Sequence, residues 1–205
     1  MWFSKQMTAA VLGLACAHSA LACGYHGAIG NYLAVMHPDS LVVAVALRQA
    51  AEAGTVDYSD LAVATRRPGM YLDVVRRLHQ FRSAFTSVAA DEDRGLVFSV
   101  GLVESGLWTR YDVSGGEAEA DIHSEGPREG EAVVLTGDAA LKGILSGTLK
   151  VDHALATGLV LIEGPEHEQT RIRRALTRLP AQPGIAVAQQ PVATTSASGA
   201  GREIK

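Results

Sequence analysis

The side chains that could bind a metal or attack a substrate are few in this chain of 205 residues. It has seven histidines and two cysteines. No two of the histidines that follow residue 22 stand at the spacing of a recognised zinc site. The sequence also has no G-x-S-x-G, H-E-x-x-H or Walker motif. We therefore expect a protein without catalysis and without a resident metal or cofactor.

The first 22 residues have the layout of a secretory signal. Lys5 is their only charged residue, and an uncharged, mostly apolar run extends from Met7 to Ala17 before a small-residue cleavage site. A helix needs about 20 residues to span a bilayer, and this run is shorter. We expect residues 1–22 to be removed during export, so that the mature protein begins at Cys23 and is periplasmic or associated with the cell envelope.

Cys23 would then be the single cysteine of the mature chain, and a lone thiol in an exported protein needs an explanation. The run Ala20-Leu21-Ala22-Cys23 resembles the lipobox of bacterial lipoproteins, although that motif favours a larger aliphatic residue where Ala20 stands. Cys23 is therefore a candidate lipid anchor, and the protein is expected on a membrane only if it is lipidated. Copper binding by Cys23 with His26 is a weaker alternative.

Charge argues against nucleic acid as a partner. The chain has 18 Lys and Arg against 22 Asp and Glu, a formal net charge of −4, and no basic run. Four arginines crowd the last predicted helix and could meet an anionic head group: Arg171, Arg173, Arg174 and Arg178. Basic residues near the end of a helix are favourable in any case, which is the simpler explanation.

Hydrophobic periodicity divides the rest of the chain into three parts. Residues 23–69 form an N-terminal helical extension, whose helix over 38–54 is apolar almost all round at its start and needs a surface to pack against. Residues 70–179 form the main domain. Residues 180–205 are rich in Pro, Ala, Ser, Gly and Gln and form a disordered tail.

The main domain begins with an amphipathic helix over 70–89, after which the apolar pattern changes to runs of strand length. The next expected elements are strands over 96–103, 107–113, 117–124 and 131–135, helices over 138–146 and 151–157, a strand over 159–162 and a helix over 165–179. The four consecutive strands predict an antiparallel meander. We expect an α+β fold: a single, mostly antiparallel sheet of about five strands, covered on one face by helices, with an extra N-terminal helix.

Small residues occur in a distinctive order between Ala132 and Gly164. An apolar strand is followed by a helix ending at Leu145-Ser146-Gly147, a short helix containing Ala154, then Gly158, an apolar strand and Gly164. This order resembles the sterol-carrier-protein lipid-binding domain. With the helix over 70–89 and the first hairpin, the resemblance covers residues 70–179. Pro165 departs from the family, which usually has an acidic residue there, and this leaves the ligand open.

The resemblance implies an apolar tunnel between the sheet and the helices, holding a hydrophobic molecule such as a lipid, a fatty acyl chain or a sterol-like compound. The expected lining residues are Phe81, Phe85, Phe98, Trp108, Leu141, Ile144, Leu145, Leu149 and Leu155. Each of them could equally be plain core. The alternative function is therefore a non-enzymatic periplasmic scaffold or partner subunit with a filled core, which docks a protein through the 38–54 helix. An enzyme with this fold as an accessory domain has the least support.

Overall fold

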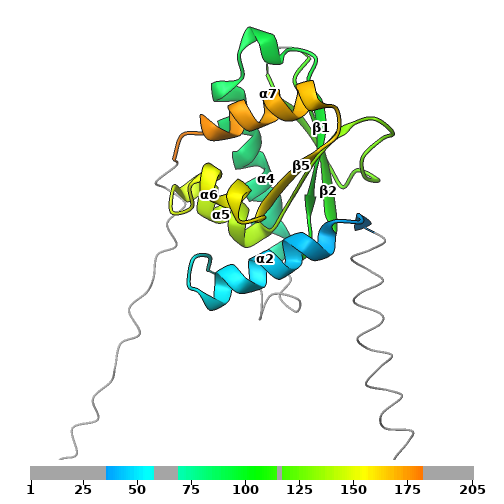
Figure 1. Cartoon of the computed structure of the whole chain (residues 1–205). Coiled ribbons are helices and arrows are strands. Elements are labelled where there is room, and N and C mark those ends of the chain that lie inside the picture. Colours follow the sequence, from blue (N-terminus) through cyan, green and yellow to red (C-terminus); the bar gives the residue numbers. More distant parts are fainter. Residues whose placement is uncertain (1–35, 58–68, 115–116, 182–205) are drawn as a thin grey trace, which may run out of the picture.

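The computed structural model describes residues 36–57, 69–114 and 117–181 (Figure 1). The predicted signal peptide, Cys23, His26 and nearly all of the predicted tail lie outside these ranges. Within them, no helix combines the length and the apolar character needed to cross a membrane.

All the helices and strands predicted for residues 38–179 are present, with bounds within two residues of the expected ones. In chain order they are α2 (Ser40–Glu52), α4 (Gly69–Val88), a 3₁₀ turn (Asp91–Asp93), β1 (Val97–Leu102), β2 (Leu107–Asp112), β3 (Glu119–Ile122), β4 (Ala132–Thr136), α5 (Asp138–Ser146), α6 (Val151–Ala156), β5 (Val160–Glu163) and α7 (Glu166–Thr177). Glycine sets several of these ends. Gly147, at φ 78°, adopts the left-handed conformation that ends α5, and its N–H donates to the Ile144 carbonyl at 3.1 Å.

The five strands form one sheet in the order β3-β2-β1-β4-β5. β1–β2, β2–β3 and β4–β5 are antiparallel, whereas β1 and β4 are parallel. The α+β fold with a mostly antiparallel sheet is thus confirmed, but the meander is wrong for its fourth strand. β3 and β4 run in the same direction, so the chain must return along the sheet between them. Residues 123–131 make that return, which is longer than a hairpin turn.

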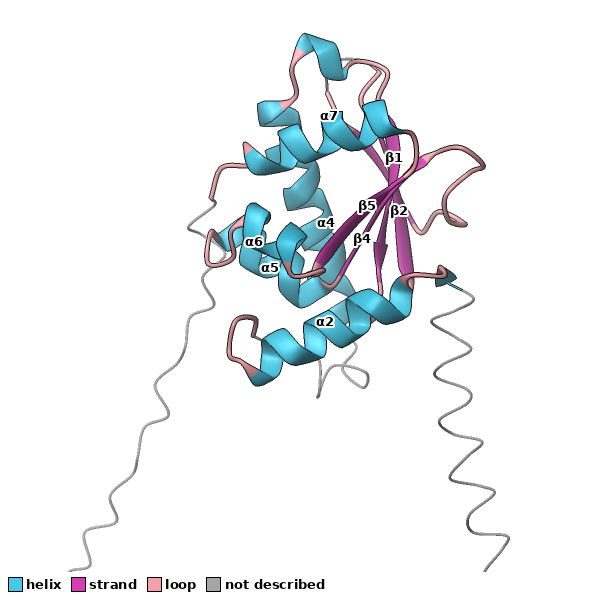
Figure 2. Cartoon of the chain, in the orientation of Figure 1, coloured by secondary structure: helices cyan, strands magenta, loops and turns pink. Residues whose placement is uncertain are grey.

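Side chains alternate between the two faces of the sheet. Phe98 of β1 pairs with Tyr111 of β2, and their rings stack on the face that carries α4. Trp108 lies three residues before Tyr111 and therefore on the opposite face. Figure 2 shows α4, α5 and α6 gathered on one side of the sheet, and α7 contacts α4, α6 and β5.

The extra N-terminal helix α2 packs against the main domain. Leu47 is fully buried and lies against Gly137, which joins β4 to α5. Just before α2, Met36 lies against Gly101 of β1, on the face of the sheet that also carries Trp108. α2 therefore crosses the lower end of the sheet as drawn in Figure 1, and its beginning reaches the face opposite α4.

Candidate functional site

Three of the expected lining residues join an aromatic cluster between α4 and the sheet. Phe81 and Phe85 of α4 lie 5.9 Å apart between ring centroids, and Phe85 lies 5.1 Å from Phe98. Tyr111 completes the cluster at 5.2 Å from Phe81 and 5.3 Å from Phe98, and its hydroxyl donates to the Leu78 carbonyl. Tyr111 was not among the predicted residues, although its register opposite Phe98 would have indicated it.

Four further expected residues belong to α5 and the turn after it, and all are buried in the same core: Leu141, Ile144, Leu145 and Leu149. Leu155 of α6 is half-buried and packs against this core from its edge. The structure thus brings eight of the nine predicted residues into one apolar layer on the helical side of the sheet.

Trp108 is not part of that layer, because strand alternation directs it to the opposite face. Its indole covers Gly101, where an added methyl would lie 2.7 Å from the ring. The rings of Trp108 and His37 meet edge to face at 6.4 Å. Trp108 therefore packs against the residues just before α2 and against Gly126 of the 123–131 connection (the crossover loop), on the other face of the sheet from Phe98.

On the face of the sheet that carries Trp108, the main polar contact is an ion pair. Glu131 accepts a hydrogen bond from the buried Ser99 hydroxyl at 2.7 Å and pairs with Arg110 at 3.1 Å. A hollow of about 470 Å³ lies beside Arg110, and it is lined by Asp121 and residues 123–128. Because Glu131 already neutralises Arg110, the hollow offers no concentrated charge of one sign.

A groove of about 500 Å³ runs between α6 and α7. One side is formed by α6, with Asp152, Leu155 and Ala156, and the other by α7, with Thr170, Arg173, Arg174 and Thr177. Leu155 is thus both a predicted ligand contact and the residue at which the apolar core meets an open groove. The groove thus combines an apolar floor with a rim of two arginines and one aspartate. Such a groove suits a molecule with a hydrocarbon body and a polar end.

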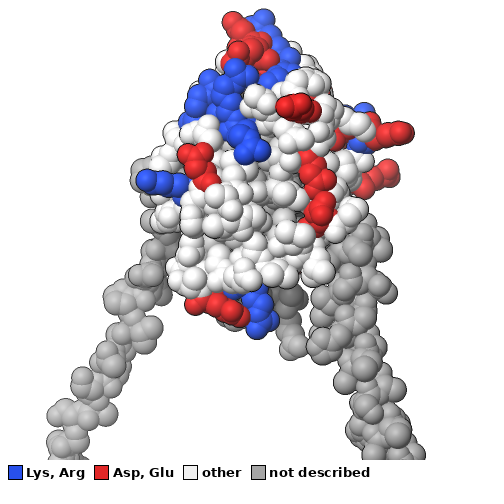
Figure 3. Space-filling view, in the orientation of Figure 1, with Lys and Arg blue, Asp and Glu red and all other residues white. Residues whose placement is uncertain are grey.

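The arginines of α7 differ in how far they are already paired. Arg171 and Arg178 face the fully buried Asp93 at 3.9 and 3.5 Å. Arg174 forms an ion pair with Glu92, whereas Arg173 is exposed and forms no ion pair with any residue that the structure describes. Figure 3 shows basic side chains over α7 at the upper end of the molecule, with acidic side chains beside them.

A buried acid lies at the start of α5. Glu104, from the β1–β2 turn, accepts a hydrogen bond from the Asp138 backbone N–H at 2.9 Å, and its other carboxylate oxygen is buried without a hydrogen-bond partner. Burial raises the pKa of Glu104 to about 7, with a smaller contribution from the charge of Asp138. The Asp138 side chain forms a largely buried ion pair with Arg77 of α4.

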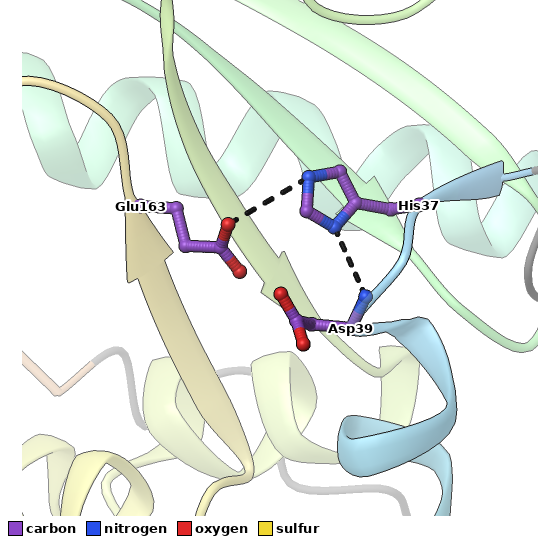
Figure 4. Close-up of side chains that lie close together, drawn as sticks. All are labelled: His37, Asp39 and Glu163. Carbon is purple, nitrogen blue, oxygen red and sulfur yellow. Dashed lines mark hydrogen bonds and ion pairs between the residues drawn. The ribbon is translucent and has the colours of Figure 1, made fainter.

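His37, Asp39 and Glu163 form a second cluster, where the start of α2 meets the end of β5 (Figure 4). His37 Nδ1 accepts a hydrogen bond from the Asp39 backbone N–H at 3.3 Å, and His37 Nε2 lies 3.9 Å from Glu163 Oε2. Burial and the neighbouring Asp39 carboxylate raise the pKa of Glu163 to about 7. The sequence did not indicate this cluster, since Glu163 is remote in the chain and its proximity depends on how α2 docks.

Neither a family model nor a curated protein matches this sequence. Among solved structures, the chain is similar to the sec-alkylsulfatase Pisa1 from Pseudomonas sp., with a TM-score of 0.38 and 16% identity over 57% of this chain and 17% of that chain. It is also similar to sterol carrier protein 2, with a TM-score of 0.34 and 14% identity over 52% of this chain and 95% of that chain. For the ubiquinone synthesis protein UbiJ-SCP2, the TM-score is 0.32 and the identity 11%, over 63% of this chain and 96% of that chain. The chain thus spans 17% of the alkylsulfatase, and likenesses at these identities concern the fold alone.

Proposed function

We propose that this protein is an exported, non-catalytic carrier of a lipid- or sterol-like molecule, whose polar end lies in the groove between α6 and α7. The observation that carries the proposal is the position of Leu155, which joins the apolar core to a groove rimmed by Arg173 and Arg174. The anionic end of an amphiphile would meet the exposed Arg173, and its apolar body would lie against Leu155 and Ala156.

Apolar burial supplies most of the affinity in such a site. Each 100 Å² of hydrocarbon surface removed from water contributes about 2.5 kcal/mol. Entry at Leu155 also leaves the aromatic cluster of Phe81, Phe85, Phe98 and Tyr111 packed as it is. The ligand contacts proposed are therefore at the α6 edge of the apolar layer rather than beside Phe98.

The test is binding of a fluorescent fatty acyl probe by the full chain, together with mass spectrometry of lipids extracted from the purified protein. We expect Leu155→Asp to weaken the probe at least about tenfold, a change of about 1.4 kcal/mol. Arg173→Ala should weaken an anionic probe but not its neutral methyl ester. Leu72→Asp and Arg48→Ala, both at exposed positions away from the groove, serve as controls. No co-purified lipid and no probe binding would refute the carrier proposal.

Export and lipid anchoring are part of this proposal and need their own measurement. The intact mass of the protein purified from the producing cell would show whether residues 1–22 are removed. The same mass would reveal a diacylglyceryl and acyl modification on Cys23. An unprocessed chain would contradict export through this signal.

A second candidate function, that of a partner subunit, is favoured by the outer face of α2. Leu41, Val42 and Val45 are 57%, 54% and 48% exposed. Figure 3 shows a largely uncharged surface over this helix, with acidic and basic side chains only along the lower edge of the molecule. Exposed apolar side chains clustered on one helix are typical of surfaces that bind another protein. Light scattering after size exclusion, compared between the parent and Val42→Lys, tests self-association. An unchanged monomer, without cross-linking to any envelope protein in cells, would argue against this function.

A further inference from the structure

We propose that His37, Asp39 and Glu163 bind one divalent transition-metal ion, with Zn²⁺ and Mn²⁺ as the best candidates. Each side chain offers one ligand atom, and these atoms lie within 4.8 Å of one another. All three residues are half-buried, so a metal ion could reach the site from solvent and still be partly shielded from it. Figure 4 shows the three side chains converging from the start of α2 and the end of β5.

The charge of the cluster favours a cation. Asp39 and Glu163 bring two carboxylates together, and within the described ranges neither forms an ion pair with a lysine or arginine. Glu163 Oε1 is buried and, while both acids are ionised, has no hydrogen-bond donor. Such an oxygen is costly to leave unsatisfied. The raised pKa of Glu163 has the same origin, because without a cation the two acids share their site best when one holds a proton.

The three ligand atoms indicate which cations could bind. One imidazole nitrogen and two carboxylate oxygens suit Zn²⁺, Mn²⁺ and Fe²⁺, with water at the remaining positions. Mg²⁺ and Ca²⁺ prefer oxygen ligands alone, so they should bind less well. Metal–ligand distances of about 2.0–2.2 Å require the three side chains to move closer together by roughly 1 Å. These are surface-accessible side chains, and rotation about their side-chain bonds can supply that movement.

Metal binding at Nε2 would change the tautomer of the His37 ring. With Nδ1 accepting from Asp39 N–H, the neutral His37 ring carries its proton on Nε2, next to Glu163. A cation bound at Nε2 takes the place of that proton, which moves to Nδ1, and the long Asp39 hydrogen bond is given up.

The position of the site gives it a structural consequence. His37 and Asp39 precede α2, while Glu163 ends β5, so a bound cation would join the N-terminal helix to the main domain. A ligand that binds the folded state alone raises the melting temperature. The proposal does not depend on the α6–α7 groove, because Glu163 lies on the opposite face of the sheet from the helical layer.

The test uses the full chain carrying Cys16→Ser and Cys23→Ser, so that neither thiol can supply the zinc affinity. After chelation and dialysis, calorimetric titration with Zn²⁺, and separately with Mn²⁺ and Mg²⁺, should show one Zn²⁺ per chain. Glu163→Gln and His37→Gln should each weaken Zn²⁺ at least roughly tenfold. His167→Gln is the matched control, because its side chain is 73% exposed and next to Glu168. The parent should also gain thermal stability with Zn²⁺, and Glu163→Gln should not.

A second measurement needs no variant in the cluster. Substoichiometric Mn²⁺ should broaden the amide resonances of His37, Asp39 and Glu163 in the parent before those of His153 and His167. Absence of Zn²⁺ binding by the parent overturns the proposal. Equal Zn²⁺ affinity in the parent and both cluster variants, or Mn²⁺ broadening centred elsewhere, overturns it as well.

Discussion

Replacing Glu104 by Gln should stabilise the protein at pH 8 and should change its stability far less at pH 5. The pKa of Glu104 is about 7 in the folded chain, because the carboxyl is buried, against 4.5 when it is unperturbed. Between these pH values the folded state holds a proton that the unfolded state has lost. Stability therefore falls as the pH rises from about 4.5 to 7, and the full cost is present above pH 7.

The size of the effect follows from the same two values. At 1.36 kcal/mol per pKa unit, their difference corresponds to about 3 kcal/mol, which is an upper limit for the gain in Glu104→Gln at pH 8. Gln keeps an oxygen that can accept the Asp138 N–H bond, so the start of α5 stays capped. At pH 5, only half a unit above the unperturbed pKa, less than about 1 kcal/mol of this cost is present, so the two proteins should differ far less.

The assay is urea denaturation of both proteins at pH 5 and pH 8, with Glu129→Gln as a control at an exposed position. Glu163 also titrates in this range, but it does so in both proteins and cancels from the difference between them. A Glu104→Gln protein that is less stable than the parent at pH 8, or that is stabilised equally at both pH values, would show that Glu104 is not held neutral by burial.

Three further substitutions test the packing, each by urea denaturation against the parent. Gly164→Ala should destabilise by roughly 2 kcal/mol or more, because its methyl would lie 2.7 Å from Ala132 Cα at a φ of 111°; a change below 0.5 kcal/mol would contradict this close approach. Tyr111→Phe should cost about 0.5–1.5 kcal/mol by removing the hydrogen bond to the Leu78 carbonyl, which keeps its helical partner in α4, and an unchanged midpoint would mean that this bond contributes nothing to stability. Phe85→Ala should cost about 3–5 kcal/mol if the aromatic cluster is solid core. A much smaller loss would indicate an interior that can collapse.

Local signals made most of the fold predictable from the sequence. The helix over 138–146 was predicted with its observed bounds, because apolar spacing and Gly147 both act within a single element. Partner choice among strands is not local in this way. β4 joins β1 rather than β3, and only the length of the 123–131 connection hinted that the chain crosses the sheet.

In the candidate site, too, local features were predictable from the sequence and contacts between distant segments were not. Phe81, Phe85 and Phe98 were recognised as neighbours, because the stripe of a helix and the inner face of a strand follow from periodicity. Trp108 was grouped with them on residue type alone, although the Leu102–Leu107 pairing at the turn fixes its face. His37 and Glu163 could not be joined from sequence, since their distance is set by the docking of α2.

The two proposed binding sites occupy different faces of the sheet, and this makes them separable by experiment. Leu155 packs against the helical side of the core, whereas Glu163 pairs with Val133 and shares the face that carries Trp108. Leu155→Asp should therefore weaken the fatty acyl probe while leaving Zn²⁺ affinity at the parent value. Glu163→Gln should do the reverse. If one substitution weakens both ligands, the sites are coupled through a change in the sheet or in α2, and the independence inferred from strand alternation is wrong.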